Sequence, residues 1–391
     1  MKRVKFYFKL LWKPVLLTVV MLVASLVLVL AEPDKVPGGY SHEEVNYFAY
    51  VNKSGLLPDN PVNLPVFVVH KISLYINNQI STLRTVNALL GICAVVLMFF
   101  VVKNWQTTRI AVMTCVLYIT ATWFLITTRN ATPVVGLLFS VIIPLLVIWN
   151  QITTKHKFAL VITALVIGML LYLPGMIWFF LAGLIWKAKS IYKLLRYSPS
   201  WNVIAAISVF IIILIPFALN ITDMNFISSI SGINFSDFSI VAYTKNLAIF
   251  PVNLFLNSGF HNSSNLGGQA IFDVFVSVLI VAGTINIIKK WRKSRSRFIL
   301  VTLLISYLLI GLGPNIPYAI TLPFFILLIS NGLSWLLQQW LTVFPRNPLA
   351  QNTGIALIVA AIAMSSIYNV YRFYVAWPHM NSTKTIYTIQ Q

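Results

Sequence analysis

Two adjacent acids, Glu43 and Glu44, lie in the segment with the best prospect of chemistry, Gly38–Tyr50, which combines glycines, polar residues and aromatic residues at helical spacing. A carboxylate near lipid is poorly solvated, which raises its pKa toward the range of a general base. Ser41 precedes Glu44 by three residues, as in a capping box, so the alternative is that one glutamate only caps a helix. Because adjacent residues do not share a helix face, we expect at most one catalytic acid, and Glu43 is the candidate.

The second candidate is the turn Thr127–Pro133, in which Arg129 is the single charged residue. A guanidinium can bind a phosphate through two parallel hydrogen bonds. Lys245, in a later segment, is a second candidate cation. The alternative for both side chains is that they reach out to lipid headgroups.

Four more polar residues are candidates for lining the same cavity: Tyr40, His42, His261 and Asp273. His261 and Asp273 flank the polar, glycine-containing segment Asn262–Gly268, where a lone histidine is more often simply exposed. The sequence contains no P-loop and no GxGxxG, HExxH or CxxC motif, so no metal-binding residues are predicted.

Long apolar runs must position these residues. The 391-residue chain is 59% hydrophobic and 9% charged, whereas a soluble domain carries roughly 25% charged residues. A formal charge of +20 could suggest nucleic acid, but the apolar runs make membrane orientation the better explanation, and no nucleic-acid partner is expected. Cys93 and Cys115 lie inside apolar runs and are interpreted as core residues, not as a disulfide or a metal site.

The runs predict an all-α integral membrane protein with about eleven transmembrane helices, since about 20 mostly apolar residues cross the hydrocarbon core. The predicted spans lie near Leu11–Leu30, Val86–Val102, Ile110–Ile126, Val134–Trp149, Phe158–Leu173, Met176–Trp186, Val203–Leu219, Ile271–Ile288, Phe298–Leu312, Tyr318–Leu337 and Ile355–Val370. The first span is interpreted as an anchor, because no convincing cleavage site follows it. Tyr172–Gly175 is predicted to be a tight turn between two short spans; a single broken helix there would invert the topology downstream.

The chain is predicted to form one transmembrane domain, residues 1–391, with large outer loops at 32–84 and 220–270 and no separate soluble domain. Both loops contain apolar stretches too short to span. We therefore expect interfacial helices lying in the membrane plane in both loops.

Charge predicts the orientation. With a cytoplasmic N-terminus and an external C-terminus in the plasma membrane, 20 of the 28 Lys and Arg residues lie inside and 8 lie outside. All 8 acids fall outside or at the outer membrane edge. Acids hardly affect orientation, so their sorting favours an outward-facing polar site; the alternative is that the outer loops are simply longer. No predicted span contains the charge relay that an ion-coupled transporter would usually need.

Taken together, the motifs resemble the type C membrane glycosyltransferases, and among these the protein O-mannosyltransferase and lipid A aminoarabinose transferase group. The resemblance rests on the acidic pair after the first span and on the turns Arg129–Pro133 and Tyr172–Gly175. Looser similarity in Val343–Pro348 and Tyr371–His379 extends it over nearly the whole chain. The chain departs from the family at Glu43, where members have an aspartate as the catalytic carboxylate.

The resemblance implies transfer of a sugar from a polyprenyl-phosphate donor to a lipid, glycan or protein acceptor at the outer membrane face. In such a reaction Glu43 would act as the base, while Arg129 and Lys245 would stabilise the leaving phosphate. Some members carry a second acid in the turn after the third span; this chain has Asn130 and Thr132 there, which argues against a divalent metal. The alternatives are a non-catalytic or flippase-like glycolipid transporter of the same architecture, and a polymerase or ligase of surface polysaccharide.

Overall fold

The computed structural model describes residues 23–24, 26–31, 35–152, 159–233, 238–256, 268–313 and 316–389. Most of the predicted first span lies outside these ranges. Within them the chain is helical throughout, and its single β-bridge joins Tyr40 to Ile389 near the two ends of the described chain. The prediction of an all-α protein is confirmed.

The helices follow the apolar runs closely. In chain order they are α2 (His42–Lys53), α3 (Leu64–Ile76), α4 (Ile80–Trp105), α5 (Thr108–Thr120), α6 (Thr122–Arg129), η1 (Pro133–Val141), α7 (Ile142–Ile152), α8 (Ala159–Leu170), α9 (Met176–Tyr197), α10 (Ser200–Leu219), α11 (Met224–Ser231), α12 (Ile240–Phe255), α13 (Val274–Lys289), α14 (Ser294–Ile310), η2 (Tyr318–Thr321), α15 (Leu322–Val343), α16 (Pro348–Tyr371), η3 (Arg372–Ala376), α17 (Trp377–His379) and α18 (Asn381–Ile386).

Four helical stretches in the described ranges are long and apolar enough to cross a membrane: α4, α10, η2 with α15, and the continuous run Pro348–His379. A fifth is added if the bent pair α5 and α6 is one span. The chain is therefore an integral membrane protein by length and composition of its helices. The count of eleven spans stays a prediction, because helices such as α8 and α13 are shorter than a full crossing.

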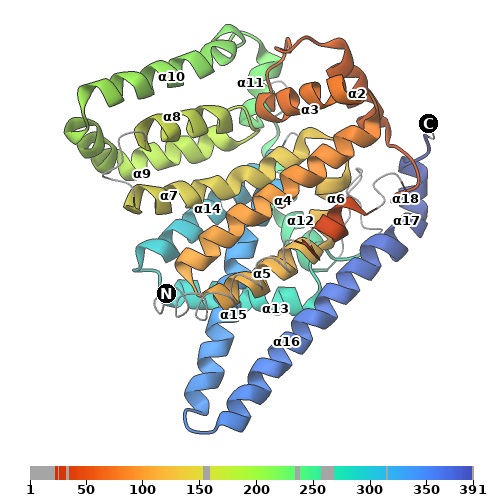
Figure 1. The fold of residues 1–391 in the computed structure, drawn as a ribbon, viewed down its shortest axis with the longest axis vertical. Helices are drawn as coiled ribbons and strands as arrows, with labels where there is room; N and C mark the ends of the chain where they lie inside the picture. The colour runs from red at the N-terminus through yellow and green to blue at the C-terminus, as the bar shows by residue number, and fades with distance from the viewer. Residues whose placement is uncertain are drawn as a thin grey trace, which may run out of the picture.

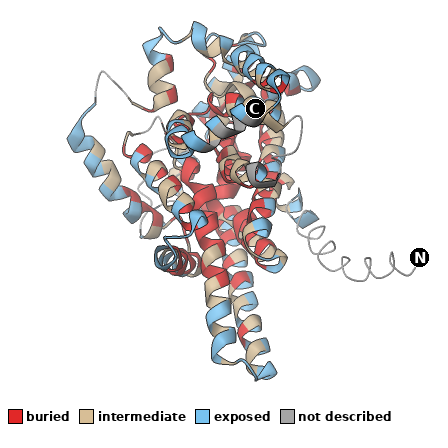
Figure 2. Cartoon of the chain, turned by 90° about the vertical axis from the view of Figure 1, so that its left-hand side faces the viewer, coloured by how far each residue is buried: buried red, intermediate tan, exposed pale blue. Residues whose placement is uncertain are grey.

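The core lies where α4, α5, α13 and α15 pack together, and it appears as the red centre of Figure 2. Helices α8, α9 and α10 form a group at the upper left of Figure 1, while α15 and α16 project from the bottom as a long hairpin. In the apolar 18-residue stretch of α10, only 11% is buried inside the protein. A helix that is apolar all round yet exposed to this extent faces lipid.

Two breaks shape the region that the site occupies. Helix α5 ends at Thr120 and α6 starts at Thr122 with a bend of 61°, so that α6 leaves the line of α5 before it ends at Arg129. The predicted turn Tyr172–Gly175 is present between α8 and α9. Gly175 has a φ of +77°, a conformation that favours glycine, and its N–H donates to the carbonyl of Ile230 at 2.8 Å.

Two glycines set a close crossing of α13 and α15 in the core. A Cβ added at Gly283 of α13 would lie 2.1 Å from the backbone oxygen of Leu328, and one added at Gly332 of α15 would lie 2.1 Å from that of Leu279. The contact is reciprocal, with each glycine four residues after the carbonyl that its partner touches. Small residues allow helix backbones to approach in this way within a membrane.

We expect Gly283→Ala to destabilise the protein by about 1–3 kcal/mol, because the two helices must separate to admit the methyl group. The thermal unfolding midpoint in detergent would measure this loss. Gly183→Ala in α9 is the matched control, since nothing lies within 4 Å of its added Cβ. Equal midpoints for the two variants would show that the crossing is looser than described.

Candidate functional site

Glu44 is the centre of the site region and is fully buried. Its Oε1 accepts hydrogen bonds from Arg84 Nε at 2.8 Å and from the backbone N–H of Ala131 at 2.7 Å. Its Oε2 accepts from Arg84 Nη2 at 2.8 Å and from the backbone N–H of Ser41 at 3.0 Å. Each carboxylate oxygen thus has two donors, which matches the capacity of an ionised carboxylate.

The capping box predicted from the sequence is confirmed. The Ser41 hydroxyl accepts from the backbone N–H of Glu44 at 3.2 Å, while the Glu44 side chain returns to the backbone of Ser41. Glu44 therefore starts α2 and at the same time pairs with Arg84 on α4 and with Ala131 in the turn after α6. With all four positions used inside the protein, Glu44 holds these segments together, and a catalytic role for either acid stays a prediction.

Glu43 is exposed, one residue before this buried centre, in the first turn of α2. The buried side chain of Tyr387 lies nearby: burial raises its pKa, and the charges of Glu44 and Glu43 raise it further. The Tyr387 hydroxyl donates to Asn130 Oδ1 at 3.0 Å. The C-terminal segment thus closes against the acidic pair and the turn after α6.

A second buried chain of hydrogen bonds lies beside Glu44. Asn87 Nδ2 donates to the carbonyls of Asn130 and Thr132 at 2.6 and 2.8 Å, so Asn87 Oδ1 is left as the acceptor for His70 Nε2 at 2.7 Å. His70 Nδ1 is then the acceptor for the Tyr47 hydroxyl at 3.0 Å. This assigns His70 a neutral ring with its proton on Nε2. Burial lowers the pKa of His70 to about 4 and raises that of Tyr47.

Arg129 is 1% exposed, at the end of α6. Its Nη1 donates to the Tyr374 hydroxyl at 2.7 Å and its Nη2 to the carbonyl of Ala31 at 2.5 Å. Its guanidinium also lies over the rings of Phe373 and Tyr374, at 5.3 and 5.2 Å from their centroids. Protein atoms therefore enclose the side chain, and its predicted role as a phosphate ligand stays a prediction.

The other candidate residues have different settings. Tyr40 is 7% exposed and stacks under the Arg84 guanidinium, 4.4 Å from the ring centroid, so it belongs to the buried centre. His42 is exposed as the first residue of α2. Lys245 is exposed on α12, which packs on α14. Arg129 ends α6, which packs on α4, α5, η1 and η3, so the two candidate cations lie on helices with different neighbours. His261 lies outside the described residues.

Asp273 forms a separate polar centre. It caps α13 through Oδ1, which accepts from the backbone N–H of Val276 at 2.8 Å. Its Oδ2 accepts from Ser365 Oγ at 2.6 Å and from Asn369 Nδ2 at 2.5 Å, both on α16. Asn369 Oδ1 in turn accepts from Thr122 Oγ1 at 3.0 Å, at the start of α6.

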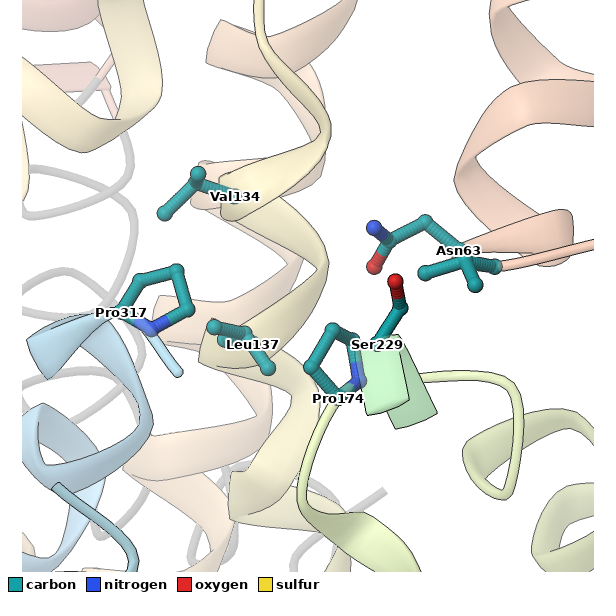
Figure 3. A pocket seen from close by; sticks show the side chains of 7 residues that line it. Asn63, Val134, Leu137, Pro174, Ser229 and Pro317 are labelled. Carbon is teal, nitrogen blue, oxygen red and sulfur yellow. The ribbon is translucent and has the colours of Figure 1, made fainter. Parts of the chain in front are cut away.

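A cavity of about 200 Å³ opens just beyond the Arg129 turn. Figure 3 shows the Asn63 amide and the Ser229 hydroxyl facing each other across it, among apolar side chains. Its lining residues are Val62, Asn63, Val134, Leu137, Pro174, Ser229 and Pro317. No residue predicted for the site is among them, so this cavity and the acidic pair are distinct features.

Sequence reasoning missed the residues that organise the region: Arg84, His70, Asn87 and Tyr387. Arg84 carried a usable signal, because it is a charge five residues into the long apolar helix that ends at Trp105, and such charges are rarely without a role. The other three have no comparable signal, since their partners are 17 to 257 residues away along the chain. Within the described ranges, no three His, Cys, Asp or Glu side chains gather to hold a metal ion.

Comparisons with known proteins give a likeness among solved structures. No family model matches the chain, and no curated protein matches it. Among solved structures, it is similar to the crystal structure of ArnT from Cupriavidus metallidurans bound to undecaprenyl phosphate. The two share 13% sequence identity with a TM-score of 0.49, over 94% of this chain and 76% of that one. The candidate site is therefore defined by the contacts of this chain itself.

We expect Glu44→Gln to cost about 3–5 kcal/mol of stability, because it leaves the buried Arg84 guanidinium without its counter-charge. The loss exceeds the ~1 kcal/mol typical of a helix cap alone. Thermal unfolding in detergent measures it, with Glu43→Gln as the neighbouring exposed control. A cap-sized loss would mean that Arg84 is stabilised by its other contacts.

His70 should make stability depend on pH. Its pKa is lower in the folded protein than the ordinary 6.5, so the unfolded chain binds more protons below pH 6.5. The contribution of His70 to the free energy of unfolding is complete above pH 6.5. It is lost as the pH falls toward 4, and the loss is on the order of 3 kcal/mol. Unfolding midpoints measured from pH 7.5 to 4.5 should fall more steeply in the wild type than in His70→Gln. Parallel curves would contradict the assignment.

Proposed function

We propose that this chain transfers a sugar from a polyprenyl-phosphate donor to a lipid, glycan or protein acceptor at the outer face of the plasma membrane. One observation carries the proposal: the backbone N–H of Ala131, in the arginine turn, donates to Glu44 at 2.7 Å. The two motifs that suggest this chemistry are 87 residues apart and meet at this contact. A carboxylate base and a phosphate-binding cation must be neighbours for the reaction proposed here.

The adjacent acids divide the work. Glu44 is buried and uses all its acceptor positions inside the protein, so it fixes the start of α2. Glu43 directly precedes Glu44 in the chain and is exposed. In the proposed reaction Glu43 takes the proton from the acceptor hydroxyl as the oxygen attacks the anomeric carbon. The bond from that carbon to the phosphate oxygen breaks on the opposite side, which inverts the configuration.

The leaving phosphate needs positive charge, and Arg129 and Lys245 are the proposed sources. Arg129 is two residues from Ala131, so its backbone lies within roughly 7 Å of the residue that binds Glu44. Lys245 is exposed on α12. In this proposal it contacts the phosphate when the donor binds. In this proposal the N-terminus is cytoplasmic and the C-terminus external, and no residue is assigned to a divalent metal.

The decisive test is Glu43→Gln in the purified protein, reconstituted in vesicles with a panel of polyprenyl-phosphate hexoses and pentoses. General-base catalysis is worth about 10²–10⁴ in rate, so transfer should fall by that factor with unfolding unchanged. Glu43→Asp should retain activity, because it keeps the base with a side chain one methylene shorter. Asp59→Asn, at another exposed acid in the same loop, is the matched control and should keep the wild-type rate.

Wild-type transfer by Glu43→Gln would remove Glu43 from the reaction. Absence of transfer by the wild type with every donor would instead favour a non-catalytic or glycolipid-transporting protein of the same architecture.

A further inference from the structure

Arg372 is the most unusual charged residue outside the acidic pair. It is 3% exposed, at the first position of the π-helix η3, where the long helix α16 changes its winding. Its Nε and Nη2 atoms are buried and have no hydrogen-bond partner among the described residues. A buried charged donor left unpaired is costly to the fold, so its retention calls for an acceptor.

No hydrogen bond joins these two donors to the neighbouring polar groups, which bond to one another instead. Asp273 Oδ2 takes the hydrogen bonds of Ser365 and Asn369, and Asp273 Oδ1 caps α13. Asn369 Oδ1 accepts from Thr122. Asp273 is close enough to act on Arg372 electrostatically, but it forms no salt bridge with it. The acidic centre thus offsets the positive charge and leaves the two buried donors unpaired.

The geometry of those donors points to a class of ligand. Nε and Nη2 lie on one edge of a guanidinium, the edge that engages two oxygens of a carboxylate or phosphate at once. Arg84 uses the same two atoms on Glu44, both at 2.8 Å. Arg84 therefore shows within this chain what the corresponding edge of Arg372 can bind.

The residues around Arg372 indicate that it lies at the boundary between an apolar and a polar environment. Tyr368 and Tyr371, on the same helix, are 49% and 59% exposed. Exposed tyrosines on an apolar helix are typical of the membrane–water interface, which is where lipid phosphates lie. A local π-helix is also frequent at functional sites, and this one carries Phe373 and Tyr374 against Arg129.

We propose that Arg372 binds the phosphate group of a membrane lipid through Nε and Nη2. The phosphate belongs either to a polyprenyl phosphate, in which case this inference rests on the proposed function and adds a donor-binding residue to it, or to an ordinary phospholipid. Both sources present the same chemistry, a phosphate oxygen pair at the interface with an apolar tail along α16.

The test is lipid binding by the purified protein in detergent, measured by native mass spectrometry with undecaprenyl phosphate, phosphatidylglycerol and inorganic phosphate as separate probes. Arg372→Gln should weaken lipid binding on the order of a hundredfold, since it removes one partner of a buried charged pair. Arg372→Lys keeps the charge opposite Asp273 but not the two-atom edge, and should weaken binding about tenfold. Arg346→Gln, at an exposed arginine in the turn between α15 and α16, should bind as the wild type does.

Dependence on Arg372 with either lipid supports the proposal, and the lipid affected identifies the source. Equal binding by the wild type and Arg372→Gln overturns it, as does binding of inorganic phosphate as tight as that of the lipids. If Arg372→Gln does not fold, Arg372→Lys carries the comparison. Because lipid binding is measured without sugar transfer, failure at Arg372 leaves the result for Glu43 standing, and failure at Glu43 leaves this one standing.

Discussion

The buried ion pair between Glu44 and Arg84 is the interaction on which the site region depends. Taking two charges out of water is costly, and such a pair is tolerated only when further hydrogen bonds satisfy both partners. Here Ser41 and Ala131 donate to the carboxylate, while Arg84 Nη2 also donates to the carbonyl of Gly39 at 2.7 Å. Together with the ion pair, these contacts fix the segment from Gly39 to Glu44, α4 and the turn after α6 relative to one another.

That arrangement explains how a surface carboxylate can have a defined position. Glu43 is exposed in the first turn of α2, where a helix end frays unless it is capped. Its backbone, however, lies within a capping box whose glutamate is anchored to a helix 40 residues further along. Chemistry at Glu43 would thus rest on a rigid frame that Glu44 provides.

The sequence predicted what depends on local pattern. The apolar runs predicted the helices, and the spacing of Ser41 and Glu44 predicted the capping box. The segment Tyr172–Gly175 predicted the break between α8 and α9. Pattern could not show that Glu44 pairs with Arg84 or that Arg129 is enclosed by Tyr374, because these partners are 40 and 245 residues apart. Pattern also could not show where a helix bends. The apolar run near Ile110–Ile126 is broken by a 61° bend that hydropathy alone does not reveal.

The two arginines, Arg84 and Arg372, illustrate a general constraint on charge inside an apolar fold. A guanidinium cannot be deprotonated in a protein, so a buried one must be given acceptors. The chain meets this demand for Arg84 with its own carboxylate, and the result is a fixed structural joint. For Arg372 it places Asp273 close enough to offset the charge, yet commits the oxygens of that carboxylate to Val276, Ser365 and Asn369. The guanidinium of Arg84 is thus paired within the fold. The guanidinium of Arg372 keeps two donors that, in our proposal, a phosphate from outside the chain accepts.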